Sequence, residues 1–411
     1  MKNLFYVVLL GLSTIIGGVI SYFYHPLMIR YLSINEFAEF ESLVGMFNIL
    51  GVLTSGIGLF LVKEISKNSK SLEKVKSIFL LSNKFLSIAG ILIYLIFCLF
   101  SPLIRDFLKF DSTLPIILTG IIIIFSFQGT VVGATLQGLK RFKFISAMGI
   151  IGQAIKLGFG LLFVILGFKL YGAIGGFLAS GLVGFLINFF YVYRLLKDEK
   201  HDEDMEGIKK DFKKEFTHVF NFFLLVFLLS IFMNIDLIFA KSFFDGNTAG
   251  IYAGLSIIAK FLIFLGGAVE TVYYPQIMEY KKEDSPKHFF VNSFLMLLIL
   301  LASALIFSYF FAPFILDLMK EGFGAYLKLF LMIMTYCGIY NFINLYSKIL
   351  IGWKNYLVNY LLSAVLVLMI GSLFIFTNGN INTFISIFII SGAVTFIGIF
   401  ALFLHAKKRI K

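Results

Sequence analysis

Residues 289–316 read FFVNSFLMLLILLASALIFSYFFAPFIL, a run without a single charged side chain. A helix needs about 20 residues to cross the roughly 30 Å of hydrocarbon in a bilayer, so this run is long enough to span a membrane. Similar runs recur along all 411 residues of the chain, which is 59% hydrophobic and only 14% charged, with a mean hydropathy of +0.95. The composition therefore predicts a polytopic α-helical membrane protein without a sizeable soluble domain.

Apolar runs separated by polar breaks predict about twelve transmembrane helices. The first run is far longer than the hydrophobic region of a signal peptide, so we expect it to be retained. Cys98 and Cys337 both lie inside apolar runs, and we expect neither a disulfide framework nor a metal site from them. The predicted spans are 5–29, 37–62, 77–101, 114–137, 144–166, 171–193, 219–243, 249–274, 289–316, 325–349, 356–377 and 383–405.

The distribution of Lys and Arg predicts how these spans are oriented. With a cytoplasmic N-terminus, 25 of the 35 Lys and Arg residues fall in cytoplasmic segments and 7 fall in the opposite loops. Because basic loops stay on the cytoplasmic side, we expect a multi-pass protein of the cytoplasmic (inner) membrane with both termini in the cytoplasm. The net charge of +12 is then mainly a topology signal that also attracts anionic lipid headgroups, and it does not indicate nucleic-acid binding.

A charged segment divides the chain into two halves that resemble each other. The sequence Gly-Leu-Lys-Arg-Phe at 138–142 is matched by Gly-Trp-Lys-Asn-Tyr at 352–356, each directly after the fourth span of its half. Because six spans is an even number, the halves start on the same side and form a parallel repeat. We expect an N-terminal six-helix bundle over residues 1–196, a cytoplasmic charged linker over 197–216 and a C-terminal six-helix bundle over 217–411.

Charged side chains inside the predicted spans are the strongest functional signal. Lys156 lies near the middle of span five with Gln153 on the same helical face, Lys260 lies near the middle of span eight, and Asp236 follows Asn234 in span seven. Each such charge costs roughly 2.5–3.5 kcal/mol at the membrane midplane, so we expect a water-filled cavity or an acidic partner to compensate for the lysines. Asp236 and Lys260 are candidates for such a pair, either functional or purely structural.

The sequence contains no motif for catalysis or nucleotide binding. No glycine is followed by lysine, so the phosphate-binding loop of nucleotide hydrolases is absent, and the five histidines lack the spacing of a metal or nucleophile site. His25, beside Pro26, either lines a pathway or is an interfacial histidine held by a hydrogen bond. We therefore predict no cofactor, no metal and no enzymatic activity. The enzyme-class alternative is a membrane-embedded glycosyltransferase or polysaccharide polymerase, which would normally carry a large acidic or arginine-rich loop.

Short motifs in both halves follow the order seen in a known family of exporters. They are PLMIRYLS at 26–33 with EFA at 36–38, LQGLKRF at 136–142, YGAIGG at 171–176, NIDL at 234–237, AGIYA at 249–253 and YPQ at 274–276. Together they resemble the polysaccharide exporters of the MOP superfamily, the O-antigen and capsule flippases, although Ser33 replaces the family's usual glycine. The resemblance covers most of the chain and implies a MATE-like fold of two six-helix bundles that rock between inward-open and outward-open states.

The same resemblance implies a function and roles for the buried charges. The implied substrate is an undecaprenyl-pyrophosphate-linked oligosaccharide, flipped from the cytoplasmic to the outer leaflet for surface polysaccharide synthesis. Cations in the cavity would neutralise its pyrophosphate, and Asp236 would either exchange a proton or sodium ion or hold Lys260 in place. The predicted cavity cations are Lys156, Lys260 and, as a weaker candidate, Arg30, with Gln153 and Asn234 as supporting polar residues.

The implied partners are the lipid-linked oligosaccharide, membrane lipids, H⁺ or Na⁺ as a coupling ion, and proteins of polysaccharide assembly, but no nucleic acid. Two related transporters are alternatives. A MATE-type ion-coupled drug/cation antiporter would carry acidic rather than basic residues in its cavity. A lipid II flippase would resemble chains of fourteen spans, and a purely structural scaffold would give no reason for two buried lysines.

Overall fold

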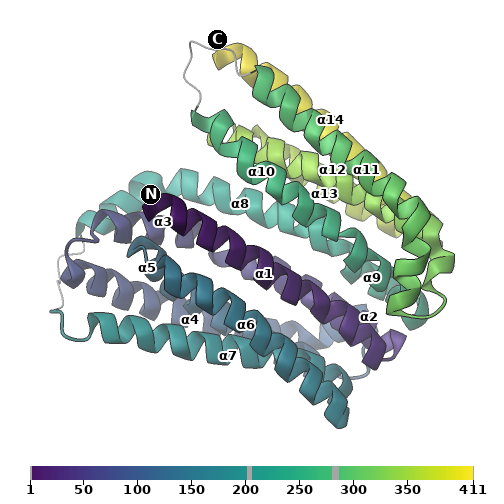
Figure 1. Cartoon of the computed structure of the whole chain (residues 1–411), viewed down its shortest axis with the longest axis horizontal. Coiled ribbons are helices and arrows are strands. Elements are labelled where there is room, and N and C mark those ends of the chain that lie inside the picture. Colours follow the sequence, from purple (N-terminus) through teal and green to yellow (C-terminus); the bar gives the residue numbers. More distant parts are fainter. Residues whose placement is uncertain (1, 201–205, 280–286, 411) are drawn as a thin grey trace. The chain divides into compact units, whose positions relative to one another are not determined.

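The computed structural model describes residues 2–200, 206–279 and 287–410 (Figure 1). Helix accounts for 91% of the structure, and no strand occurs in these ranges, which confirms the predicted all-α fold. The contacts divide the chain into two compact units, Met1–Phe223 (unit 1) and Leu224–Lys411 (unit 2). The division lies inside helix α8 (Glu206–Phe243), just beyond the predicted linker 197–216.

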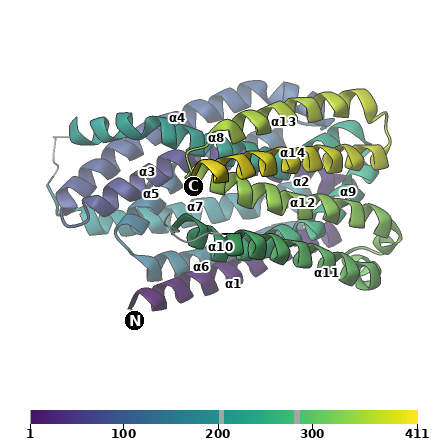
Figure 2. The ribbon, with the colours of Figure 1, turned by 90° about the horizontal axis from the view of Figure 1, so that it is seen from above.

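Unit 1 is a helical bundle in which α5 carries a long series of buried side chains. Helix α6 packs against α1 and α7, and α5 packs against α3, α4 and α7 (Figures 1 and 2). Gly167, with a φ of 91°, reverses the chain between α6 and α7, in a left-handed conformation that glycine adopts without a steric penalty. The elements are α1 (Lys2–Tyr31), α2 (Ile34–Gly51), η1 (Val52–Thr54), α3 (Ser55–Lys67), α4 (Leu72–Leu108), α5 (Leu114–Gly138), α6 (Phe142–Phe163), η2 (Val164–Phe168), α7 (Lys169–Leu196) and the first part of α8.

Unit 2 is built around helix α12, which contacts α9, α10, α11 and α14. The inner position of α12 agrees with its long series of buried side chains, which runs from Phe330 to Ile351. The elements after α8 are α9 (Gly246–Ala259), α10 (Phe261–Glu279), α11 (Lys287–Met319), η3 (Phe323–Tyr326), α12 (Leu327–Gly352), α13 (Leu357–Phe376) and α14 (Ile381–Ile410).

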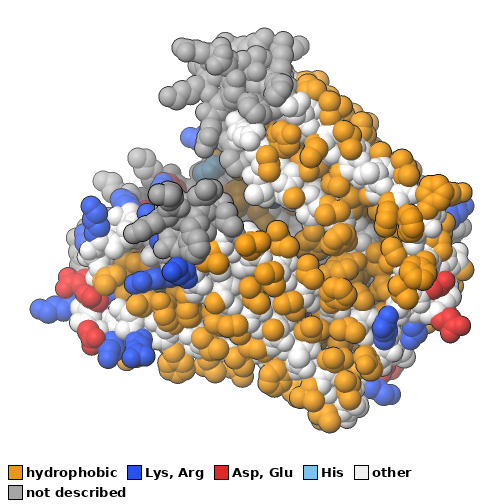
Figure 3. All heavy atoms as spheres, viewed as in Figure 1, with side chains coloured by type: hydrophobic (Ala, Val, Ile, Leu, Met, Phe, Trp, Pro, Cys, Tyr) orange, Lys and Arg blue, Asp and Glu red, His pale blue; other side chains and the backbone are white. Residues whose placement is uncertain are grey.

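The structure has the helices that a multi-pass membrane protein requires. Eleven segments in the described part of the chain are long and apolar enough to cross a membrane. One of them, residues 142–196, consists of α6 and α7 packed against each other on either side of Gly167, so it accounts for two predicted spans. Hydrophobic side chains cover much of the described surface in Figure 3. The prediction of about twelve transmembrane helices is confirmed.

Two of the predicted spans are interrupted, which we did not predict. Span two, expected to be continuous over 37–62, consists of α2, the short tight turn η1 and α3. Span eight, expected over 249–274, changes from α9 to α10 at Lys260, where the amide of Ile263 donates to the Lys260 carbonyl at 2.9 Å in an i to i−3 pattern. Tighter turns inside helices often mark hinges. The interrupted helix is the second of each half, so the breaks follow the internal repeat.

The repeat is also visible in the backbone of the matched turns. Lys140 and Lys354 both adopt left-handed conformations, with φ values of 56° and 58°. The amide of Lys140 donates to Gln137 at 2.9 Å, and the amide of Lys354 donates to Ile351 at 2.8 Å. The flanking amides form equivalent bonds in both turns. The sequence match at 138–142 and 352–356 therefore corresponds to one turn that occurs twice.

The second helix of each half begins with a polar cap. The Ser33 hydroxyl accepts from the amide of Glu36 at 3.2 Å, and the Glu36 carboxylate accepts from the amide of Ser33 at 2.9 Å, which forms a capping box at the start of α2. Asp245 caps α9 in the same way by accepting from the amides of Asn247 and Thr248. Hydrogen bonds from Thr248 lower the pKa of Asp245 below its ordinary value. Ser33, where the resembled family has glycine, thus has a clear structural use.

Candidate functional site

A cavity of about 500 Å³ lies among three helices of unit 1. This volume is within the range of pockets that hold small molecules. Residues at helical spacing on one face of each helix line the cavity, together with Phe47 of α2. The lining includes Ser126, Gly129, Gly133 and Gln137 of α5, Ile145, Met148, Gly149, Gln153 and Lys156 of α6, and Phe177, Ser180, Gly184, Phe185 and Asn188 of α7.

Lys156 is the one charged side chain among the described residues that line this cavity, and it is only 6% exposed. Its ammonium group donates to the Ser21 hydroxyl at 2.6 Å. It also lies 4.8 Å from the ring centroid of Phe177 and 5.2 Å from that of Tyr24. Aromatic faces attract cations, and these contacts offset part of the cost of burying the charge. The ammonium group is thus held in place at the cavity wall.

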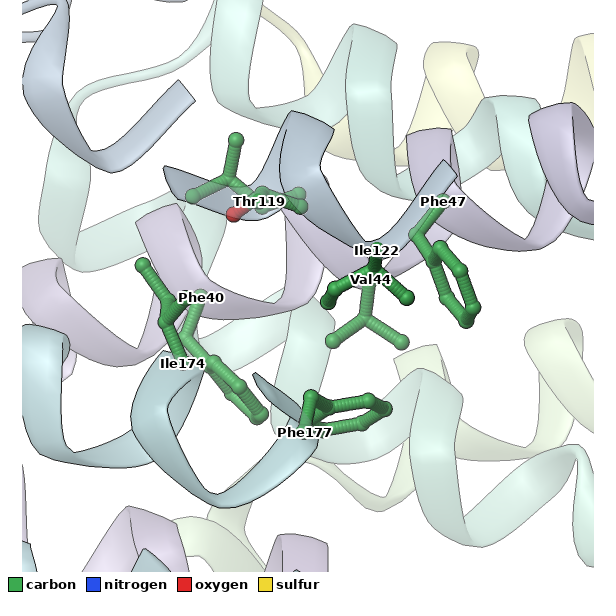
Figure 4. Close-up of a pocket in the computed structure, with 8 residues that line it drawn as sticks. Phe40, Val44, Phe47, Thr119, Ile122, Ile174 and Phe177 are labelled. Carbon is green, nitrogen blue, oxygen red and sulfur yellow. The ribbon is translucent and has the colours of Figure 1, made fainter. Parts of the chain in front are cut away.

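A cluster of apolar side chains closes the cavity near Lys156. Phe47, Ile122 and Phe177 line the cavity and also a much smaller pocket of about 10 Å³ (Figure 4). The other residues around the small pocket are nearly all apolar and come from α2, α5 and α7. A space of this size has room for about one water molecule and offers it few polar partners. The cavity therefore ends at this cluster.

In the other direction, the cavity extends along α6 toward the turn between α5 and α6. Its lining runs from Lys156 to Ile145, which corresponds to about 16 Å of helix at 1.5 Å per residue. Gln137, at the end of α5, is exposed at this end. Gln153 lies between the two ends, and its side-chain oxygen is buried without a hydrogen-bond partner. The predicted residues Lys156 and Gln153 thus lie on the same wall of the cavity, which continues past them toward Gln137.

The structure adds a buried acidic residue that the sequence analysis missed. Glu41 of α2 is fully buried, and one of its carboxylate oxygens lies 2.5 Å from Nδ1 of His25 on α1. The other carboxylate oxygen is buried without a hydrogen-bond partner. The charge of Glu41 also acts on Lys156. A carboxylate within span two was the signal that could have identified it, because ionisable residues inside spans are rare and usually functional.

Replacing His25 with leucine should lower the stability of the protein, because Glu41 would lose its hydrogen-bond partner while remaining buried. A buried polar group left unsatisfied costs about 1–3 kcal/mol, and a charged group costs more. The double variant His25→Leu/Glu41→Met should recover much of the loss, since replacing both partners by apolar groups is often nearly neutral. Thermal unfolding of the purified protein measures both effects. Equal stability of the single variant and the wild type would contradict a paired role for His25.

In unit 2, Asp236 and Lys260 form a buried ion pair. Nζ of Lys260 donates to one oxygen of Asp236 at 2.8 Å. The other oxygen accepts from the Tyr252 hydroxyl at 3.0 Å and from the Ser256 hydroxyl at 2.8 Å. Asp236 is 1% exposed and Lys260 is 6% exposed. Both carboxylate oxygens are therefore occupied, and the pair lies at the break between α9 and α10.

The two remaining predicted site residues lie apart from these clusters. The buried amide of Asn234 donates to the carbonyl of Ser230 at 2.9 Å within α8. Arg30 is exposed in the last turn of α1, and it is not among the residues that line the cavity. Of the predicted residues, the structure thus brings together Lys156 with Gln153 in unit 1, and Lys260 with Asp236 in unit 2. The roles assigned to all six residues stay predictions.

Comparisons with known proteins agree with this architecture. A family model described as "Polysaccharide biosynthesis protein" matches residues 2–281. No curated protein sequence matches the chain. The lipid II flippase MurJ in an inward closed conformation has a similar structure, with 16% identity, a TM-score of 0.71 and coverage of 98% of this chain and 90% of MurJ.

Two other transporters of the MOP superfamily have the same fold. An outward-facing multidrug resistance MATE transporter is 16% identical with a TM-score of 0.64, and the match covers 99% of this chain and 96% of that one. A transporter from Pyrococcus furiosus is also 16% identical with a TM-score of 0.64, over 98% and 95% of the two chains. These similarities show the MATE-like fold that the motifs implied.

Proposed function

Because the chain belongs to the polysaccharide biosynthesis protein family, we propose that it flips an undecaprenyl-pyrophosphate-linked oligosaccharide across the cytoplasmic membrane by alternating access. The observation that carries this proposal is Lys156, a buried ammonium group held at the wall of a cavity within unit 1. A pyrophosphate is a strong anion, and an anion bound there would offset the cost of burying the cation. The lipid tail would remain in the bilayer.

The fold supports a substrate of this kind. A protein described as a lipid II flippase has the same fold over 98% of this chain. The fold is thus compatible with moving a lipid whose head group must cross the membrane. The glycan, the coupling ion and the assembly proteins that would act with the transporter are not defined by this similarity.

The position of the cavity agrees with loading from the cytoplasm. Its lining reaches the turn between α5 and α6, which contains Lys140 and Arg141 and is followed by Lys143 in α6. Basic turns stay on the cytoplasmic side of the membrane, and the same rule assigns both chain termini to the cytoplasm. We propose that the head group enters from this end and that Lys156 binds its pyrophosphate.

The charge of the cavity argues against a drug/cation antiporter. The charged residue among the described lining residues is a lysine, which repels a cationic drug and attracts an anion. Glu41 lies outside that lining and is engaged by His25. The electrostatics therefore favour an anionic substrate.

Complementation tests this proposal. The wild-type chain, expressed in a strain that lacks its own oligosaccharide flippase, should restore surface polysaccharide, whereas the empty vector should not. Resistance to cationic drugs should stay unchanged in the same cells. Absence of export together with increased drug resistance would instead identify the protein as an antiporter. Protein levels in the membrane fraction control for expression.

A further inference from the structure

Five glycines line the cavity of unit 1, and all of them except Gly181 face open space. The four that face open space are Gly129 and Gly133 on α5, Gly149 on α6 and Gly184 on α7. A Cβ atom added at any of the four would have no heavy atom within 4 Å. Gly160 is different, because a Cβ there would collide with the side chain of Tyr24. Helix packing therefore explains Gly160 but does not explain the four cavity glycines.

Glycine at these positions weakens the helices, because it has more conformational freedom than alanine in the unfolded chain. Alanine would fit all four positions sterically and would favour the helix. What alanine would change is the cavity, since each added methyl group would occupy free volume. The four glycines thus make the cavity wider at a cost to helix stability.

We call the surface formed by Gly129, Gly133, Gly149 and Gly184 the glycine wall, and the side chains around it suit a sugar. Ser126, Ser180 and Asn188 each donate to a backbone carbonyl, which leaves their side-chain oxygens to accept from a ligand. The rings of Phe125 and Phe185 lie 6.3 Å apart between their centroids. Gln153 lines the cavity, and its buried side-chain oxygen has no hydrogen-bond partner among the described residues. A pyranose ring has hydroxyl groups around its edge and apolar C–H faces. It therefore needs the mixture of polar groups, aromatic faces and open backbone that this wall offers.

The glycine wall also lies at a suitable distance from the cation. Gly149 and Lys156 are on the same side of α6, separated by about 10 Å along the helix at 1.5 Å per residue. This separation is similar to the combined length of a pyrophosphate group and one sugar ring. A head group with its pyrophosphate at Lys156 would place its first sugar beside the glycines.

We infer that the glycine wall is the binding site for the sugar attached to the pyrophosphate, and that Gly129, Gly133, Gly149 and Gly184 set the size of sugar that fits. The inference rests on the function proposed above and adds a second subsite to it. Lys156 binds the charge that all such lipids share, and the glycine wall binds the part in which they differ.

Two lipids separate the subsites experimentally. The purified full-length protein is titrated with undecaprenyl pyrophosphate and with the same lipid carrying one N-acetylhexosamine. The wild type should bind the glycosylated lipid about tenfold more tightly than the bare lipid, in keeping with a few well-placed polar contacts. Gly133→Leu and Gly184→Leu should lose the preference, so that the glycosylated lipid binds no more tightly than the bare lipid does.

Gly158→Leu is the matched control. Gly158 is also a helical glycine with open space at its Cβ position, but it is exposed and is not among the residues lining the cavity. The Gly158→Leu variant should keep the full preference for the glycosylated lipid. The milder variant Gly133→Ala should show a thermal midpoint no lower than that of the wild type and a reduced preference.

Leucine variants at Gly133 and Gly184 that keep the full preference would overturn the sugar site and leave the proposed function intact. A wild-type protein that binds neither lipid would overturn the proposed function and this inference with it.

Discussion

Cells that carry Lys156→Met in place of the wild-type chain are expected to lose surface polysaccharide export. Methionine keeps most of the length of the side chain and removes the charge that faces the cavity. A hydrogen bond to a charged group contributes about 1.5–3 kcal/mol, which corresponds to roughly ten- to hundredfold weaker binding of the pyrophosphate. Export measured at equal protein level, together with binding of undecaprenyl pyrophosphate to the purified variant, checks this prediction.

Two further variants separate charge from packing at this position. Lys156→Arg keeps a cation and should retain part of the export. Lys84→Ala removes a lysine that also lies within a span but is exposed on α4, and it should export normally. If Lys156→Met failed to accumulate in the membrane while Lys156→Arg did, the contacts with Ser21, Tyr24 and Phe177 would be structural, and the substrate role would lose its support.

The second large effect is expected at the ion pair of unit 2. Lys260→Met leaves Asp236 charged and buried without its cation. Asp236→Asn leaves Lys260 charged and buried without its anion. Removing one partner of a buried pair typically costs 3–5 kcal/mol. The double variant Asp236→Asn/Lys260→Met should recover most of that loss, because the asparagine oxygen still accepts from Tyr252 and Ser256. Thermal unfolding of the three variants measures the coupling.

Export by the double variant separates the two roles considered for Asp236. Both of its oxygens are occupied by groups of unit 2, so we expect a structural pair and restored export. A double variant that is as stable as the wild type but exports nothing would instead assign ion coupling to Asp236. Proton or sodium dependence of transport would then be the next measurement.

The sequence was sufficient for the helices of this fold because each span carries its own signal. The length of the apolar runs predicted the spans. The repeated motif at Lys140 and Lys354 predicted that the two halves are duplicates, and the matching left-handed turns at these residues agree with that prediction. The breaks at Thr54 and Lys260 were not predictable from hydropathy, because they depend on contacts between helices. The Thr54 hydroxyl lies 2.6 Å from that of Thr130 on α5, and Lys260 is bonded to Asp236 on α8.

The candidate site was predictable only in part for the same reason. Lys156 stood out because a charge inside a span needs compensation, and the spacing of Gln153 placed it on the same face. Glu41 was missed although it carries a similar signal. Its partner His25 could be found only from the packing of α1 on α2, and the walls of the cavity depend on how three helices come together.

The cavity glycines have a consequence for how this protein can evolve. A change from a glycine codon to one for alanine or valine needs a single nucleotide. At Gly129, Gly133, Gly149 and Gly184 the new side chain would extend into free volume, so such changes alter the shape of the cavity without disturbing its supporting helices. Selection by a new surface glycan can therefore act on these positions one mutation at a time, with each intermediate still folded. Related chains that serve different glycans should differ at these four positions while keeping a cation at the position of Lys156.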